Sequence, residues 1–506
     1  MDNTGPSGDP NGLPLITTPI TLIGGPDTVI ERSATAPEFR IFEVTGPAGA
    51  LTLDGTGRER QYDNGRDHYP GRDHRPGRGD GWDDGRDHRP GRGDGDGWGL
   101  ATALLSGLDS YDRDRSCRDG SGLTVRGGSS TDDGGAVFVD DDRSLTLECT
   151  TLTGNHADTD GGAIKALNSA SITTTSSRIN SNTATRNGGG ISIVLTLEDG
   201  AFSMSLKNSE VNDNTADGDG GGISTTAGID GQGTVNISLR NTKVNGNTAD
   251  DGSGINTVAG IQDGGTFSMN LKSSEVSDNT AVDDGGGMFT VVGVIDGTFT
   301  TNLADTKVNA NTAGGNGGGI NTSAGVEDGG TVSTNLKNSE VNNNTAGEDG
   351  GGLYTVASAQ SGSTFHTSLE GTEVNNNTAS DGDGGGLYTL AASDIGSTLG
   401  IRLEDSEVND NTAVGDGGGV FNLTSNGVLD IDSTTLTGNQ AGSLGGGLFH
   451  DSGTATLTDS TVTLNQATDG GGIYEAGGDV ILNQTAVMNN IPNNCAPPGA
   501  VPGCVG

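Results

Sequence analysis

Val341-Asn342-Asn343-Asn344-Thr345-Ala346 is one copy of a phrase that recurs twelve times along this chain. The phrase consists of a hydrophobic residue, two small polar residues and an asparagine, and close copies begin at Val211, Val244 and Val374. Its last asparagine falls at positions 155, 182, 214, 247, 279, 311, 344, 377, 411, 439, 465 and 490. These gaps of 25 to 34 residues indicate a solenoid, in which each repeat folds into one unit and contacts only its neighbours.

Residues 264–292 illustrate how one repeat is expected to fold. Apolar and polar residues alternate over 267–271, which predicts a half-buried strand. A second, short strand is predicted at 274–276 and a third at 288–292, with glycine- and aspartate-rich bends between them. Three strands and three bends per repeat predict an all-β chain that forms a parallel β-helix of about twelve or more coils.

Stacked coils turn columns of the sequence into ladders of side chains. Columns of leucine and valine are predicted to line the interior, and the asparagine column is predicted to form a hydrogen-bonded amide ladder. On the outside, Glu210, Lys243, Glu275, Lys307 and Glu340 alternate in sign from one coil to the next. Opposite charges that face each other across a strand pair are stabilising, so this alternation is independent support for stacking.

The composition restricts the classes of partner. Of 506 residues, 67 are acidic and 26 are basic, which gives a formal net charge of −41. Phosphate binding needs clustered Lys and Arg, so this charge argues against nucleic acid as a partner. The sequence holds no run of 18 apolar residues, and no membrane span is therefore predicted.

The repeat pattern divides the chain into four parts. They are N-terminal coils at 1–55, an insertion at 56–121, the main β-helix at 122–490 and a Pro-rich tail at 491–506. The insertion is a low-complexity Gly/Arg/Asp segment that cannot bury a core, so it is expected to be disordered. Arg-Gly-Asp triplets begin at Arg78 and Arg92. A repeat rich in these three residues produces such triplets by chance, and the alternative interpretation is that they mimic an adhesion motif. Without the insertion, residues 51–55 would join 123–127 in what reads as one strand.

The start of the chain and its cysteines bear on localisation. Met1 is followed by neither a basic nor an apolar segment of the kind that begins a signal peptide. We expect that the true start of translation lies upstream of Met1 and that a signal peptide is encoded there. Cys495 and Cys504 bracket the Pro-rich tail and are candidates for a disulfide, with two free thiols as the alternative. Cys117 and Cys149 have no spacing that predicts a partner. The expected location is extracellular or at the cell surface.

The stretch Gly161-Gly162-Ala163-Ile164 and the repeated phrase resemble the paired motifs of polymorphic outer-membrane-protein repeats. The segments 11–17 and 494–499 are similar to the ends of secreted bacterial β-helix proteins of the CSLREA type. This resemblance implies a single-stranded right-handed parallel β-helix and a secreted bacterial protein. Enzymes that act on acidic polysaccharides also have this fold.

Acidic residues recur before each glycine run. Examples are Asp217 with Asp219, Asp283 with Asp284, and Asp381 with Asp383. Their constant place in the repeat predicts turn residues, and a column that binds Ca²⁺ is the alternative, although Asn316 and Leu444 interrupt it. His156, His366 and His450 fall in different repeats without a partner pattern. No nucleophile and base occur together, so the sequence predicts no catalysis and no metal site; the alternative is a polysaccharide lyase or glycoside hydrolase of the pectin-lyase-like superfamily.

One row of aromatic residues stands apart from the uniform columns. It consists of Tyr354, Tyr388, Phe421, Phe449 and Tyr474, each the second residue of a predicted strand on consecutive coils. Alternation with inward apolar residues predicts that these rings point outward to solvent, where they would stack on sugar rings or on a partner protein. The alternative is a ladder of rings that stiffens the sheet. The expected role is therefore binding, adhesion or support, with carbohydrate or a surface protein as partner.

Overall fold

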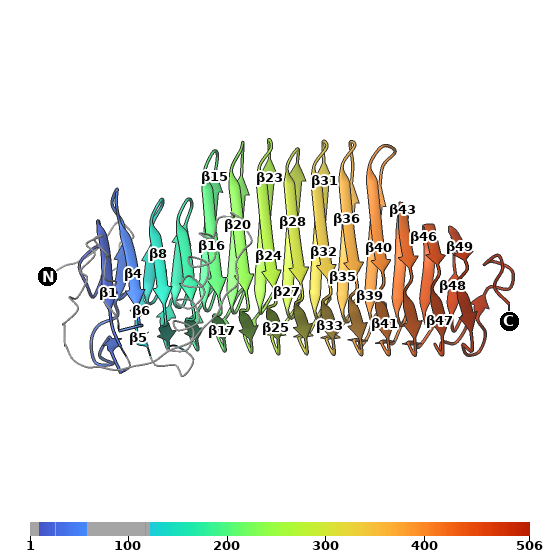
Figure 1. Ribbon diagram of the computed structural model, residues 1–506, viewed down its shortest axis with the longest axis horizontal. Coiled ribbons are helices and arrows are strands. Elements are labelled where there is room, and N and C mark those ends of the chain that lie inside the picture. Colours follow the sequence, from blue (N-terminus) through green and yellow to red (C-terminus); the bar gives the residue numbers. More distant parts are fainter. Residues whose placement is uncertain (1–9, 26, 58–116, 118–121, 506) are drawn as a thin grey trace, which may run out of the picture.

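The computed structural model describes residues 10–25, 27–57, 117 and 122–505. These residues form a parallel β-solenoid of about twelve coils and contain no helix. The coils stack along a rod, with the N-terminal coils at one end and the C-terminal coils at the other (Figure 1). The predicted fold class is confirmed.

One coil contains four strands, one more than the sequence predicted. In the repeat discussed above they are β24 (Thr266–Lys272), β25 (Glu275–Ser277), β26 (Thr280–Ala281) and β27 (Met288–Ile295). The additional strand, β26, follows directly after the ladder asparagine and is two residues long. A strand of this length shows no alternation, and for this reason the sequence pattern indicated a turn there.

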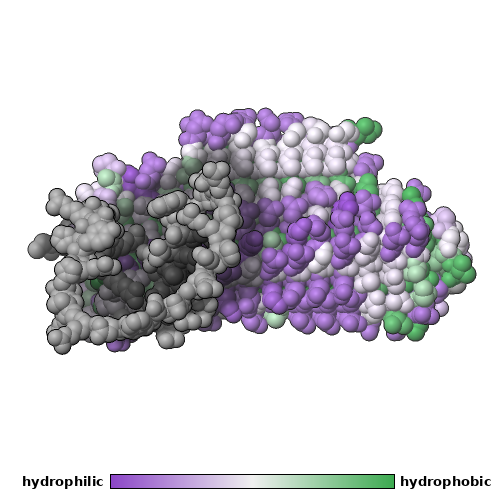
Figure 2. Space-filling model, viewed as in Figure 1, coloured by the Kyte–Doolittle hydropathy of each residue, from purple (hydrophilic) through white to green (hydrophobic). Residues whose placement is uncertain are grey.

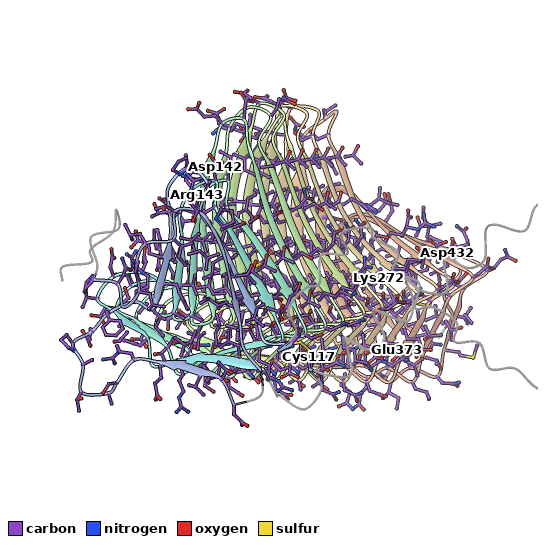
Figure 3. The ribbon with its side chains drawn as sticks, turned by 60° about the vertical axis from the view of Figure 1, so that its left-hand side comes forward. Cys117, Asp142, Arg143, Lys272, Glu373 and Asp432 are labelled. Carbon is purple, nitrogen blue, oxygen red and sulfur yellow. A yellow bond between two sulfur atoms is a disulfide. The ribbon has the colours of Figure 1, made fainter. Side chains whose placement is uncertain are left out.

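All named strand pairs are parallel, and the strands form three sheets of 26, 14 and 11 strands within the described residues. The largest sheet contains both long strands of every coil, because β43 (Val420–Asp432) pairs with β39 (Leu387–Ser393) and with β40 (Thr398–Glu404). Viewed obliquely along the rod, the cross-section is triangular, with the bend between the two long strands at its apex (Figure 3).

The apex is higher in the middle of the rod than at its ends. From β15 (Ile191–Leu197) and β16 (Ala201–Lys207) up to β39 and β40, all of the long strands have seven or eight residues and form a ridge (Figure 1). The ridge ends at β43, where one strand of 13 residues runs across the apex. We call this feature the ridge below.

The asparagine column forms the predicted amide ladder. Asn344 is completely buried, and its Nδ2 donates to Asn377 Oδ1 at 3.0 Å and to the carbonyl oxygen of Val308 at 2.8 Å. Its Oδ1 accepts from both the backbone N–H and the side-chain amide of Asn311. Each buried amide thus uses all its hydrogen-bonding groups, which is the condition for placing polar groups in a core.

The apolar ladders and the alternating charges are also confirmed. Leu303, Leu336 and Leu369 are at most 1% exposed and belong to one continuous core. On the outside, Lys243 contacts Glu275 at 3.1 Å and Lys307 contacts Glu340 at 2.8 Å.

The boundary of the insertion differs from the prediction of one continuous strand. β4 (Ala50–Asp54) and β5 (Leu123–Arg126) lie in different sheets, so a bend separates them. At this bend, a Cβ on either Gly55 or Gly122 would collide with the carbonyl oxygen of Cys149 on the next coil. Both glycines allow the backbone of the bend to pass close to its neighbour. Of the insertion, only residues 56–57 and Cys117 belong to the described residues.

Both pairs of cysteines form disulfides. The predicted bond between Cys495 and Cys504 is present. Cys117 and Cys149 are also bonded, with their Cα atoms 5.4 Å apart, a pair that the sequence spacing did not indicate. The spacing of the two residues did not predict this bond, because Cys117 belongs to the insertion. The repeat pattern does not determine that Cys117 lies beside Cys149.

The tail closes part of the C-terminal end. β51 (Cys495–Ala496) pairs with β48 (Ile473–Glu475), and Val501 packs onto the core with 3% of its surface exposed. Apolar side chains nevertheless gather at this end, seen in green at the right of the otherwise largely hydrophilic face in Figure 2. Among the described residues, no helix has the length and apolarity needed to cross a membrane.

Candidate binding face

The five aromatic residues singled out in the sequence form one continuous stack. They occupy the second position of β35 (Leu353–Ala359), β39, β43, β46 (Leu448–Thr458) and β48, and these positions pair in register. Successive ring centroids from Tyr354 to Tyr474 are 5.0, 4.8, 5.0 and 5.8 Å apart, with interplanar angles of 12° or less. The rings therefore stack as a ladder, which was the alternative interpretation of this row.

These rings point away from the core but are less exposed than the sequence predicted. Phe421 and Phe449 are each 7% exposed, and Tyr354, Tyr388 and Tyr474 are half-buried. The glycine run before each strand also passes close to the base of the side chain. An added Cβ on Gly350, at φ +67°, would lie 2.8 Å from Cβ of Tyr354.

The tyrosine hydroxyls belong to a partly buried, acidic environment. Burial raises the pKa of Tyr354, and the nearby carboxylate of Asp349 raises it further. The same two causes raise the pKa of Tyr388. Both phenols are consequently neutral at physiological pH and able to donate a hydrogen bond to a ligand.

Two further outward rows continue the face from the aromatic row toward the ridge. The first contains Val291, Ser323, Val356 and Leu390 in register, with Val291 and Leu390 36% and 37% exposed. The second contains Gly293, Gly325, Ser358 and Ala392. A Cβ on Gly293 or Gly325 would meet no atom within 4 Å, so this part of the face is flat and open.

The acidic column lies along the edge of this face and has a structural use. Asp349 Oδ1 accepts a hydrogen bond from the backbone N–H of Asp383, and Asp383 Oδ1 accepts one from the N–H of Asp416. Burial raises the pKa of Asp219, Asp251, Asp349 and Asp383, with further increases from neighbouring carboxylates. In the part of the chain that the structure describes, no three His, Cys, Asp or Glu side chains are grouped to hold a metal ion.

The three histidines identified in the sequence lie apart. His156 contacts Asp158 and Thr183 at the surface, and burial lowers the pKa of His366. His450 is completely buried, and its Nδ1 accepts a hydrogen bond of 2.9 Å from Asn422. Burial also lowers the pKa of His450. The column of residues that contains His450 changes from Thr389 to Asn422 and then to His450 on successive coils. This change in residue type is visible in the sequence but was not used to predict a buried polar pair.

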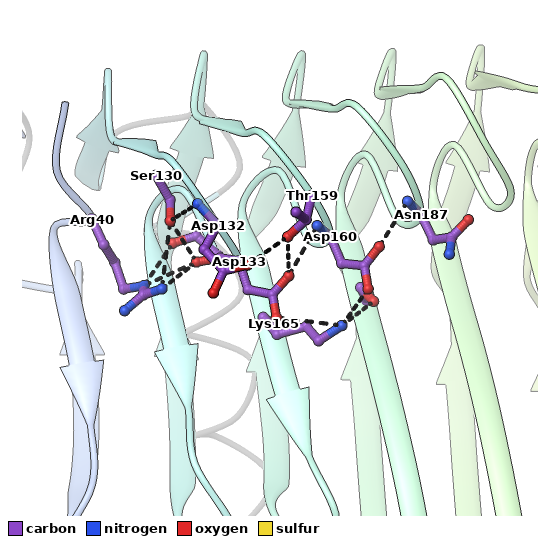
Figure 4. Close-up of polar contacts among 10 residues, drawn as sticks. Arg40, Ser130, Asp132, Asp133, Thr159, Asp160, Lys165 and Asn187 are labelled. Atoms are coloured by element: carbon purple, nitrogen blue, oxygen red, sulfur yellow. Dashed lines mark hydrogen bonds and ion pairs between the residues drawn. The ribbon is translucent and has the colours of Figure 1, made fainter. Parts of the chain in front are cut away.

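Sequence reasoning also missed a buried charge network in the N-terminal coils (Figure 4). The Lys165 ammonium group contacts Asp160 at 2.6 Å and Asp133 at 3.9 Å, and Lys165 is almost completely buried. One coil boundary away, Arg40 pairs with Glu43 at 3.1 Å, with both side chains inaccessible to solvent. The pairing satisfies charges that would be costly to bury alone, so the network fixes the first coils to each other.

Comparisons of the chain with protein-family models, with curated proteins and with solved structures give no match.

Proposed function

We propose that this protein is an extracellular or cell-surface β-solenoid that binds an extended carbohydrate and does not catalyse its conversion. The observation that carries this proposal is the pair of partly exposed, stacked tyrosines, Tyr354 and Tyr388, beside the flat rows of small and apolar residues. The C–H face of a sugar ring packs on aromatic and aliphatic surfaces of this kind, and the phenol hydroxyls supply hydrogen bonds.

The charge of the chain favours a neutral carbohydrate over a uronate polymer. The net charge is −41, and the acidic column borders the tyrosine row. A polymer of carboxylates would meet like charge at this face, whereas sugar hydroxyls can donate hydrogen bonds to the aspartates.

Two features support an extracellular, non-catalytic role. Both pairs of cysteines are bonded, which suits an oxidising compartment. The aspartates that a lyase or hydrolase would need are engaged with backbone N–H groups of the next coil. These side chains connect successive coils of the scaffold.

Binding to arrays of neutral glycans and to insoluble polysaccharides tests the proposal. Tyr354→Ala with Tyr388→Ala is expected to abolish binding, because it removes the accessible rings. Phe449→Ala is the matched control, since it interrupts the same ring stack at a buried position and should retain binding. Loss of binding in the control as well, or release of sugar products by the wild-type chain, would contradict the proposal.

A further inference from the structure

Charged residues on one corner of the rod are segregated by sign along its length. The column at the C-terminal end of the second long strand runs in register through eight coils. Its members are Lys207, Arg240, Lys272, Ala304, Lys337, Glu370, Glu404 and Asp432. We call Lys207, Arg240 and Lys272 the basic row and Glu370, Glu404 and Asp432 the acidic row. Figure 3 labels Lys272 and Asp432 on this corner.

The basic row has no ion-pair partner among the residues that the structure describes. All three cations are exposed, and none forms an ion pair with any carboxylate among residues 10–25, 27–57 and 122–505. They lie directly opposite one another on adjacent coils, about 4.8 Å apart, an arrangement in which like charges destabilise a sheet. The neighbouring column, with its ion pair between Lys243 and Glu275, shows that this chain places opposite charges in register elsewhere.

The acidic row also places like charges opposite one another, although Glu370 pairs with Lys337 at 2.6 Å and Glu404 with Arg402 at 3.1 Å. Glu370 lies opposite Glu404, and Glu404 lies opposite Asp432. Beside them in the neighbouring column, Glu373 and Glu407 are exposed and also lie opposite each other. The corner therefore carries an excess of positive charge at one end and an excess of negative charge at the other, and each excess is stabilised by opposite charge from outside the chain.

The two rows are placed symmetrically. The midpoint of the column lies between Ala304 and Lys337, and a two-fold axis there would exchange Lys272 with Glu370 and Arg240 with Glu404. The same axis would place Lys207 opposite Asp432 of the second copy. A two-fold interface makes every such contact twice, so all six charged side chains of each copy would meet opposite charge over about 34 Å.

We propose that this corner is the interface of an antiparallel homodimer, in which the basic row of each copy contacts the acidic row of the other. A linear polyanion along the corner would meet the acidic row, and a polycation would meet the basic row. Only a partner with the inverse order of charges fits the whole column, and a second copy in reversed direction has that order. Electrostatic complementarity of this kind fixes register and orientation.

Sedimentation velocity in about 0.1 M NaCl tests the proposal, because screening over about 10 Å then limits repulsion between the two acidic rods. The wild-type chain is expected to dimerise. The basic-row variant K207E/R240E/K272E and the acidic-row variant E370K/E404K/D432K are each expected to dimerise at least about tenfold more weakly. An equimolar mixture of the two variants is expected to recover the dimer, because each then offers the charge that the other needs.

The ridge supplies a matched control. E198K/D230K/E327K changes the net charge as much as the acidic-row variant does, at exposed positions away from the corner, and is expected to dimerise like the wild type. A monomeric wild-type chain would overturn the proposal, as would a mixture that stays monomeric although both variants retain their β-sheet circular dichroism. Binding of a polyuronate to a monomeric wild-type chain, lost in the basic-row variant, would also contradict the proposed dimer.

Discussion

The Asp349 carboxylate accepts a hydrogen bond of 2.7 Å from the backbone N–H of Asp383, which occupies the same position one coil further along the rod. The aspartate side chain is therefore a connection between coils as well as a turn residue. The same connection works without a negative charge, since Asn316 Oδ1 accepts from the N–H of Asp349 at 3.1 Å.

Asp349→Asn is expected to stabilise the protein at neutral pH by roughly 0.5 kcal/mol, because it keeps the acceptor and removes a partly buried like charge. Burial raises the native pKa of Asp349 above its usual value of 3.8, so the charged form opposes folding at neutral pH. This penalty disappears as the pH falls through the raised native pKa toward 3.8. Thermal unfolding of both proteins between pH 7 and 4 should show the difference shrinking, and a gain that persists at low pH would exclude this cause.

Asn344→Ala is expected to destabilise the protein by about 3 kcal/mol or more, since it leaves buried donors and acceptors of the amide ladder without partners. Asn343→Gly is the control, because Asn343 is exposed and has a φ of +59° that glycine adopts freely. Urea unfolding should give a large loss for the first variant and little or none for the second.

Tyr388→Phe is expected to protect the protein against alkali. The native pKa of Tyr388 is raised by burial and then by Asp349, so ionisation above the usual value near 10 is more favourable in the unfolded chain. The wild type should therefore lose stability as the pH rises past about 10, and the variant should lose less. Equal losses in both proteins would show that the hydroxyl is not responsible.

Replacement of Cys495 and Cys504 by serine is expected to loosen the C-terminal end by about 2–3 kcal/mol, the usual contribution of a short disulfide loop. The effect should be local, because each coil contacts only its neighbours. Hydrogen exchange is expected to accelerate in β51 and in β49 (Asp479–Asn483) while the ridge strands stay protected. Uniform acceleration along the rod would contradict a local role.

The regular parts of the fold could be predicted from the sequence, because equivalent side chains have the same surroundings in every coil of the stack. The asparagine ladder and the alternation of Lys307 and Glu340 follow from spacing alone. The partial burial of Tyr354 could not be predicted, since it depends on how closely neighbouring segments such as the backbone at Gly350 approach the side chain, and a run of glycines indicates only that a turn is present.

Some features were present in the sequence but needed the register to become visible. Successive members of the column that holds the basic and acidic rows are 28 to 34 residues apart, and they line up only once the ends of the long strands are fixed. The bond between Cys117 and Cys149 depends on the path of an insertion, which no repeat pattern determines.

Removal of one complete coil tests the central claim most directly, which is that each repeat is one interchangeable layer of a stacked rod. Deletion of residues 312–344 joins Asn311 to Thr345, restores the repeated phrase and leaves Asn311 to stack on Asn377. This protein is expected to keep its β-sheet circular dichroism and to unfold cooperatively, with a rod shorter by about 4.8 Å. Deletion of residues 312–327 alone, which removes half a coil, should prevent folding. If both deletions unfold the chain equally, the stacked-layer account is wrong.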